Sequence, residues 1–365
     1  MMWKAMGAAA IACAAVVLGL SGCNAGSESG VVREESAKTQ PAQGKTAEAR
    51  AAALYRAVVD DPARYFEGLQ EQGRTEGVQF SYALVRATDG DVPTLLLRAT
   101  GPMESWNGIS QIVPLMVDSG AKELVVPEGW YAEGAAGAGG FRGQMSCSAY
   151  GDGLLLSEVS SGSGAGTISR IVWNGHGWEE RIACDTQIGA NLATDTLISD
   201  ESVDIPWVDI SGDDTDLSCL DALEKGSWTP AIEEPESSMD EAAEKMGLLV
   251  VSGTMHRVDR QALLDLQGIE DPNPGTDDAS VYAVFVPDEP CEITATSGDG
   301  MGTSTGQASM FLVDSRGDES SWGAYKDQRV TVALDGTHLH WPSDTSLPVG
   351  EPRVMPGGIT VLSMK

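Results

Sequence analysis

Cysteine and histidine, which serve as nucleophiles, bases and metal ligands, are few in this 365-residue sequence: it has six cysteines and four histidines. His338 and His340 are spaced so that, on a strand, both rings would lie on one face and could form the edge of a metal site. No H-x-x-x-H pattern or nearby cysteine completes a ligand set, so we expect no metal. His176 and His256 stand on separate predicted elements.

One short stretch has the letters of a hydrolase motif. Gly302-Thr303-Ser304-Thr305-Gly306 fits G-x-S-x-G, but that motif needs a strand–turn–helix context. The surrounding pattern predicts a polar loop between strands instead, so we interpret the match as incidental. No phosphate-binding loop, dinucleotide fingerprint or C-x-x-C motif is present. We therefore expect no catalytic residue and no cofactor, and we predict that the protein is not an enzyme.

Cys23 ends a segment typical of an export signal. Lys4 precedes an apolar run from Ala5 to Leu20, which is too short for a confident membrane span. The residues Leu20-Ser21-Gly22-Cys23 resemble the lipobox of bacterial lipoproteins. The resemblance implies that the Cys23 thiol receives a diacylglyceryl group and that residues 1–22 are removed as a signal peptide. The alternative is an uncleaved N-terminal anchor with an incidental cysteine.

The lipobox, together with an acidic composition rich in Ala and Gly, resembles uncharacterised surface lipoproteins of Gram-positive, actinobacterial type. This resemblance implies an extracytoplasmic, lipid-anchored protein on the outer face of the cell membrane. Its partners would be the membrane, through the anchor, and an unknown envelope protein or ligand. Residues 23–46 are then the lipid anchor and a flexible tether, which spans roughly 27 Å as a random coil.

An exported protein can form disulfides, and four cysteines remain besides Cys13 and Cys23. Four cysteines allow three connectivities. Cys147 and Cys184 fall in the same predicted group of strands, so we expect them to pair. Cys219 and Cys291 fall in different predicted domains and are expected to be free and buried.

The chain is strongly acidic, with 54 Asp and Glu against 23 Lys and Arg and a formal net charge of -31. Such a chain repels nucleic acid, so we expect no nucleic-acid partner. The acidic stretch from Asp204 to Trp228 lacks the D-x-D-x-D-G spacing of a preformed calcium loop and is interpreted as solvated. Hydrophobic residues make up 42% of the chain, which is ample for packed cores.

The fold is predicted to be mainly β (α+β). Residues 47–228 combine a helical lead-in, in which Asp61 and Pro62 break and restart the helix, with an antiparallel β-meander. The expected strands are 80–87, 94–100, 110–118, 123–127, 140–150, 154–160, 168–174 and 179–184, and they are separated by turn sequences. Spacing this short leaves no room for the crossover helices of a parallel sheet.

One hairpin in this meander resembles a known repeat. Tyr82-Ala83-Leu84-Val85, Asp89-Gly90-Asp91 and Pro93 to Leu97 are similar to the strand, Asp-Gly-Asp turn and Pro-Glu-Leu strand of many uncharacterised surface proteins. The resemblance implies a propeller-like arrangement, and some copies of the repeat bind calcium in the turn. Arg86, Ala87 and Thr88 replace the upstream acidic positions here, so we expect a plain hairpin turn.

Residues 229–246 are predicted to be an acidic connector between two domains, which becomes helical near Met239. Residues 247–365 then return to β-patterning, with expected strands at 248–255, 280–286, 292–295, 308–313, 329–334 and 359–362 and a short helix from Arg257 to Leu266. This number of strands predicts a small OB-like β-barrel.

Two functional interpretations fit these features. The first is a membrane-anchored extracytoplasmic lipoprotein with a non-enzymatic binding or scaffolding role at the cell envelope. The second is the substrate-binding lipoprotein of an ABC importer, whose fold needs alternating β and α units in two lobes. Few helices are predicted after Gly73, which favours the first interpretation. A hydrolytic enzyme is a third possibility, but no nucleophile–base pair is identifiable.

Overall fold

The first described element is a helix whose sequence fixes both its start and its buried face. The computed structural model describes residues 46–66, 76–102, 106–118, 122–136, 140–190, 192–231, 235, 237–275, 280–314 and 322–364. Helix α1 (Ala47–Asp60) begins where the Thr46 hydroxyl accepts a hydrogen bond from the Ala49 N–H at 3.2 Å. Ala51, Tyr55 and Val58 lie on its buried face. The predicted signal peptide, Cys23 and the tether up to residue 45 lie outside the described residues.

The helix restarts only briefly after α1. Pro62 opens a four-residue 3-10 helix, η1 (Pro62–Tyr65), and the Asp61 side chain makes no capping hydrogen bond. The sequence predicts that the helix restarts at Pro62, and in the described residues this restart is a single 3-10 turn. Within the described residues, no helix is long and apolar enough to cross a membrane.

Strands β1 to β11 form the first sheet. They are β1 (Gln79–Val85), β2 (Thr94–Thr100), β3 (Ile109–Val117), β4 (Leu124–Val125), β5 (Tyr131–Ala135), β6 (Phe141–Ser148), β7 (Leu154–Ser160), β8 (Ala165–Trp173), β9 (Trp178–Gln187), β10 (Ser202–Val203) and β11 (Val208–Ile210). The sheet order is β11-β1-β2-β3-β5-β6-β7-β8-β9, with β4 on β3 and β10 on β6. All its pairings are antiparallel, so the sequence prediction of an antiparallel meander is confirmed.

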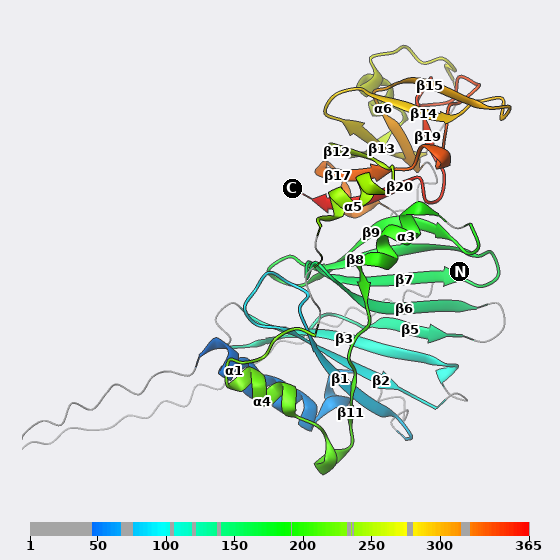
Figure 1. The fold of residues 1–365 in the computed structure, drawn as a ribbon. Helices are drawn as coiled ribbons and strands as arrows, with labels where there is room; N and C mark the ends of the chain where they lie inside the picture. The colour runs from blue at the N-terminus through cyan, green and yellow to red at the C-terminus, as the bar shows by residue number, and fades with distance from the viewer. Residues whose placement is uncertain are drawn as a thin grey trace, which may run out of the picture. The chain divides into compact units, whose positions relative to one another are not determined.

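Two apolar clusters cover the two faces of this sheet. On one face α1 and α4 (Ser218–Glu224) lie side by side, and Figure 1 shows both against β1 and β2. On the other face lies a cluster that includes Leu96, Ile112 and Leu156, with Tyr131, Trp178 and Trp207 packed against it. These three aromatic residues thus lie on the face away from α1.

Strands β12 to β20 form the second sheet. They are β12 (Leu249–Asp259), β13 (Val281–Pro287), β14 (Cys291–Thr296), β15 (Thr303–Ala308), β16 (Phe311–Asp314), β17 (Gln328–Leu334), β18 (Leu339–His340), β19 (Arg353–Val354) and β20 (Ile359–Met364). Their order is β15-β14-β18-β19-β16-β13-β12-β17-β20. The pairs β14–β18 and β16–β19 are parallel and the others antiparallel. Among the described residues, no pairing closes this sheet into a barrel.

The expected strand from 308 to 313 is wrong, because the chain turns there. Strand β15 ends at Ala308 and β16 begins at Phe311. The Glu351 carboxylate accepts hydrogen bonds from the N–H of Ser309 at 3.0 Å and of Met310 at 3.3 Å. These bonds satisfy backbone donors that a continuous strand would pair in the sheet.

The remaining elements include the short helices α3 (Ala193–Glu201), α5 (Met239–Lys245) and α6 (Arg260–Gln267) and the 3-10 turns η2 (Gly212–Asp214), η3 (Gly323–Tyr325) and η4 (Gly336–His338). Lys45–Lys365 form one compact unit. A shared apolar cluster joins Leu155 of β7, Leu197 of α3, Ala243 of α5 and Leu362 of β20. The two sheets fall on either side of the acidic connector and contribute to this same cluster.

Candidate functional site

A cavity of about 550 Å³ is lined by two segments that lie far apart in the sequence. The first is residues 125–131, which lead from β4 into β5. The second begins at His176, in the turn between β8 and β9, and ends at Glu180. Strand β5 lies between β3 and β6, and β9 lies at the edge of the same sheet. The meander therefore brings together two segments that are 45 positions apart in the sequence, counted from Tyr131 to His176.

The sequence shapes both segments through turn chemistry. At the β8–β9 turn the Asn174 side-chain oxygen accepts hydrogen bonds from the N–H of His176 at 3.0 Å and of Gly177 at 2.9 Å. Trp173 and Trp178 pair across this hairpin with their ring centroids 5.5 Å apart, in an edge-to-face arrangement. In the other segment Gly129 has φ 92°, a conformation that other residues rarely adopt.

The cavity combines aromatic and acidic side chains. Trp130 is 43% exposed, an unusual degree for a tryptophan, and Tyr131 and Trp178 lie beside it in the lining. Glu128 and Glu180 supply carboxylates. The described lining residues include no lysine, arginine, serine or cysteine. The cavity therefore offers aromatic rings and hydrogen-bond acceptors, but no nucleophile of those types.

Glu180 contributes to the electrostatics of this region. The Ser169 hydroxyl donates a hydrogen bond to its Oε1 at 3.0 Å. Burial, and then the Glu180 charge, raise the pKa of Glu158 above its ordinary value. The same two causes raise the pKa of Tyr131, so its phenol stays protonated at neutral pH. The region is therefore electronegative and partly shielded from water.

On the same sheet face, one cation of the protein itself is already bound by an aromatic ring and a carboxylate. The Arg98 guanidinium lies 4.3 Å from the centroid of the Trp207 ring, a cation–π contact. Arg98 Nη1 also lies 3.5 Å from Glu133 Oε2. Both Trp207 and the cavity residue Tyr131 pack against one apolar cluster.

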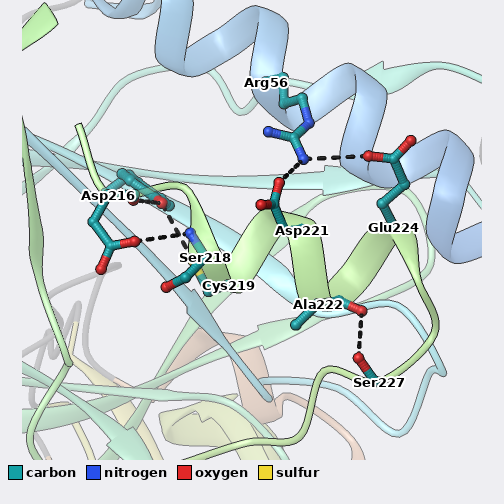
Figure 2. A network of polar contacts seen from close by, with 9 residues as sticks. Arg56, Asp216, Ser218, Cys219, Asp221, Ala222, Glu224 and Ser227 are labelled. Atoms are coloured by element: carbon teal, nitrogen blue, oxygen red, sulfur yellow. Dashed lines mark hydrogen bonds and ion pairs between the residues drawn. The ribbon is translucent and has the colours of Figure 1, made fainter. Parts of the chain in front are cut away.

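Figure 2 shows a second polar network, where α1 meets α4. Arg56 forms ion pairs with Asp221 and with Glu224, the latter at 3.3 Å. The hydrogen bond that Arg56 donates to Asp221 raises the pKa of Arg56. The Tyr82 hydroxyl donates to the carbonyl oxygen of Asp216 at 2.5 Å.

Cys219 belongs to the same network, and its thiol donates to the Tyr82 hydroxyl at 3.3 Å. It borders a smaller cavity of about 380 Å³. The contacts tie α4 to α1, to Tyr82 of β1, and to the loops before and after α4. This arrangement holds the two helices on the sheet, and we assign it a structural role.

The expected disulfide between Cys147 and Cys184 is wrong: all four described cysteines are free thiols. Cys147 lies on β6 and Cys184 on β9, with β7 and β8 between them. Three strand spacings of about 4.8 Å far exceed the ~7 Å limit for bridged Cα atoms. Two cysteines in the same meander are therefore not neighbours in space when two other strands lie between their own strands.

Both thiols are buried instead. Burial raises the pKa of Cys147 to about 12, so it remains a protonated, unreactive thiol at neutral pH. Cys219 and Cys291 are likewise free, but half-buried and not fully buried as expected.

His338 and His340 do not share a strand as their spacing predicts. His338 ends the 3-10 turn η4, where its Nδ1 lies 3.1 Å from Asp335 Oδ2. His340 belongs to β18, and burial followed by the Arg353 charge lowers its pKa. In the part of the chain that the structure describes, no group of three or more His, Cys, Asp or Glu side chains could hold a metal ion.

Ser304 lies within β15 and not in the polar loop expected from the sequence. Its carbonyl oxygen accepts a hydrogen bond from the Trp341 indole at 3.1 Å. Because the motif lies on a hairpin strand paired with β14, it lacks the strand–turn–helix context of a nucleophile elbow.

The cavity itself was not predicted from the sequence. A usable signal exists, since both lining segments place a glycine directly before a tryptophan at the start of a strand: Gly129-Trp130 and Gly177-Trp178. No protein-family description, curated protein or solved structure matches this chain. The functional argument therefore rests on the geometry and on the sequence.

Proposed function

We propose that this protein is a lipid-anchored, extracytoplasmic binding protein with a non-enzymatic role on the outer face of the cell membrane. Diacylglyceryl-Cys23 holds it to the membrane through the tether of residues 23–46, and residues 1–22 are removed. The bound species is a ligand or envelope partner that reaches the protein from outside the cell. The observation that carries the binding role is the cavity of about 550 Å³.

The cavity supports binding for two physical reasons. Its volume lies in the range of roughly 300–1,000 Å³ that small-molecule sites occupy. Its lining mixes apolar and aromatic surface with two carboxylates, Glu128 and Glu180, which suits orientation of a ligand by a few polar contacts.

The substrate-binding protein of an ABC importer is the second candidate. That fold alternates β and α units in two lobes with parallel sheets. The described pairings are antiparallel apart from the two short pairs β14–β18 and β16–β19. This topology favours the first candidate.

At finer detail, we propose that the first sheet is propeller-like, as its Asp-Gly-Asp hairpin suggests, and that the C-terminal domain is OB-like. An experimental structure of residues 247–365 within the whole chain would test the second proposal. Pairing of β15 with β20 would support a closed barrel, and two free edges would rule it out.

The anchor is tested by metabolic labelling with a fatty-acid analogue in a bacterial host. Wild-type protein should be labelled, and Cys23→Ala should not be, because the acyl acceptor is missing. Cys13→Ala is the matched control, since Cys13 lies within the signal peptide, and its mature product should be labelled like the wild type. Equal labelling of Cys23→Ala would disprove the anchor.

A further inference from the structure

We propose that the cavity between residues 125–131 and the β8–β9 turn binds a small organic cation, through its ammonium group. This inference deepens the proposed binding role and rests on it. The carboxylates of Glu128 and Glu180 would attract the charge, and the rings of Trp130, Tyr131 and Trp178 would form the walls.

The first support is an excess of acidic side chains. Two carboxylates line the cavity, whereas its described lining has one histidine, His176, and no lysine or arginine. The charge of Glu180 reaches its surroundings, since it helps to raise the pKa values of both Glu158 and Tyr131. A shielded negative site of this kind favours a cation over a neutral or anionic ligand.

The second support is the aromatic surface. Organic ammonium groups are recognised by the faces of aromatic rings, and tryptophan is the most effective of these. Trp130 is partly exposed, while Trp178 is held by Trp173 at the base of its hairpin. One ring is thus open to solvent, and another is packed against a neighbouring tryptophan.

The third support is the arrangement around Arg98. There the protein places its own guanidinium between the Trp207 ring and the Glu133 carboxylate. The cavity has the same two components, a tryptophan and a glutamate, but its described lining has no lysine or arginine to fill that position. An external cation would complete the same type of contact.

A neutral sugar is the principal competing occupant, because sugars also stack on tryptophan and hydrogen-bond to carboxylates. The size of the cavity limits either occupant to a small molecule. The two classes differ in their dependence on charge, and the experiment uses that difference.

The test is calorimetric titration of the chain from residue 23 onward with Cys23→Ser, which needs no detergent. The probes are choline, its uncharged isostere 3,3-dimethylbutanol, and cellobiose. We expect saturable choline binding and at least about tenfold weaker binding of the isostere. Glu180→Gln should weaken choline binding by about tenfold or more and Trp130→Ala by about fivefold or more.

Glu179→Gln is the matched control for Glu180→Gln. It makes the same charge change one residue away on β9, where the side chain points to the opposite face and pairs with Arg181 at 2.7 Å. We expect it to leave choline binding unchanged within about twofold. Thermal unfolding of each variant checks that it is folded.

Equal affinity for choline and the isostere would overturn the inference, and so would equal effects of Glu179→Gln and Glu180→Gln. Saturable binding of cellobiose or the isostere without choline would refute the cationic ligand and leave the proposed binding role standing. No saturable binding of any probe would count against the binding role of this cavity as well. The comparison of choline with its isostere uses unmodified cavity residues, so it decides the matter even if a variant fails to fold.

Discussion

Arg170 and Glu201 form the most deeply buried ion pair among the described residues. The side chains are 9% and 1% exposed, and Arg170 Nη2 lies 3.0 Å from Glu201 Oε2. Burial alone would lower the pKa of Arg170, but the charges of Glu201 and Asp152 raise it overall. The guanidinium also contacts the Met239 sulfur at 3.4 Å, so the pair joins β8, α3 and α5.

Removing one partner of this pair should be costly, because the other charge stays buried. We expect Arg170→Met to lower the free energy of unfolding by about 3–5 kcal/mol in urea denaturation. The control is Arg329→Met, which breaks the exposed pair with Asp288 and should cost less than about 1 kcal/mol. Similar losses in the two variants would contradict this account.

Glu158 should give stability a defined pH dependence. Burial and Glu180 raise its pKa in the folded state above the ordinary value of 4.5, so the folded protein holds this proton more tightly than the unfolded chain does. Its contribution is therefore fully present below pH 4.5 and is lost as the pH rises through the raised pKa.

The measurement is urea unfolding of wild type and Glu158→Gln at several pH values between about 4 and 7. The stability of wild type relative to the variant should fall across that interval, because the amide that replaces the carboxyl group does not titrate. A difference that is constant with pH, or that grows in favour of wild type, would show that Glu158 is not held in the environment described.

At the scale of single elements, β5 positions the cavity and depends on one glycine. Gly134 has φ 124°, and a Cβ added there would lie 2.1 Å from the carbonyl oxygen of Gly108. This close approach lets β5 pair with β3 at Ile109 and so fixes Tyr131, at the other end of the strand, in the cavity wall.

Gly134→Ala should therefore cost more than about 1 kcal/mol in the free energy of unfolding and should also weaken choline binding. Gly302→Ala is the control, since Gly302 is not among the cavity-lining residues and a Cβ at that position meets no atom within 4 Å. We expect its effect on stability to stay within about 0.5 kcal/mol. Stability and choline affinity of Gly134→Ala that match those of Gly302→Ala would contradict this role of β5.

Strands rich in β-branched and large apolar residues could be predicted from the sequence, and β2, β7 and β17 match the expected ranges closely. Strand β5 could not, because Tyr131–Ala135 is rich in Gly and Ala and has no periodic apolar pattern. Helix α3 was missed for a related reason, since its Thr and Asp residues are weak helix formers and tertiary contacts stabilise it.

The site was harder to predict than the strands. Its residues come from a connecting segment and a hairpin turn, and the Gly-Trp pair that each contains does not by itself show that the two segments meet. Only the curvature and order of the sheet bring them together, and these depend on pairings between distant strands. The incorrect prediction of a disulfide between Cys147 and Cys184 has the same origin, because the sequence does not show that β7 and β8 separate β6 from β9.

At the scale of the whole molecule, the two sheets contribute to one apolar cluster around α3 and α5. The Thr194 hydroxyl on α3 also donates a hydrogen bond to the Gly357 carbonyl at 3.1 Å, just before β20. Because this cluster is buried and shared, we expect Lys45–Lys365 to unfold as a single cooperative unit.

Urea unfolding followed by far-ultraviolet circular dichroism and by tryptophan fluorescence should give coincident transitions. Two separate transitions would instead indicate that residues 47–228 and 247–365 are independently stable, as their separate sheets would permit.

The central claim is that this protein binds a small organic cation in the cavity beside Trp130. The most direct test is a titration of ¹⁵N-labelled protein with tetramethylammonium, observed at the indole N–H resonances and assigned with single tryptophan-to-phenylalanine variants. We predict saturable shifts for Trp130 and Trp178 and unchanged resonances for Trp106 and Trp228, which belong to the apolar cluster beneath α1 on the other face of the sheet. Shifts that are absent, that never saturate or that affect all four indoles alike would contradict the account.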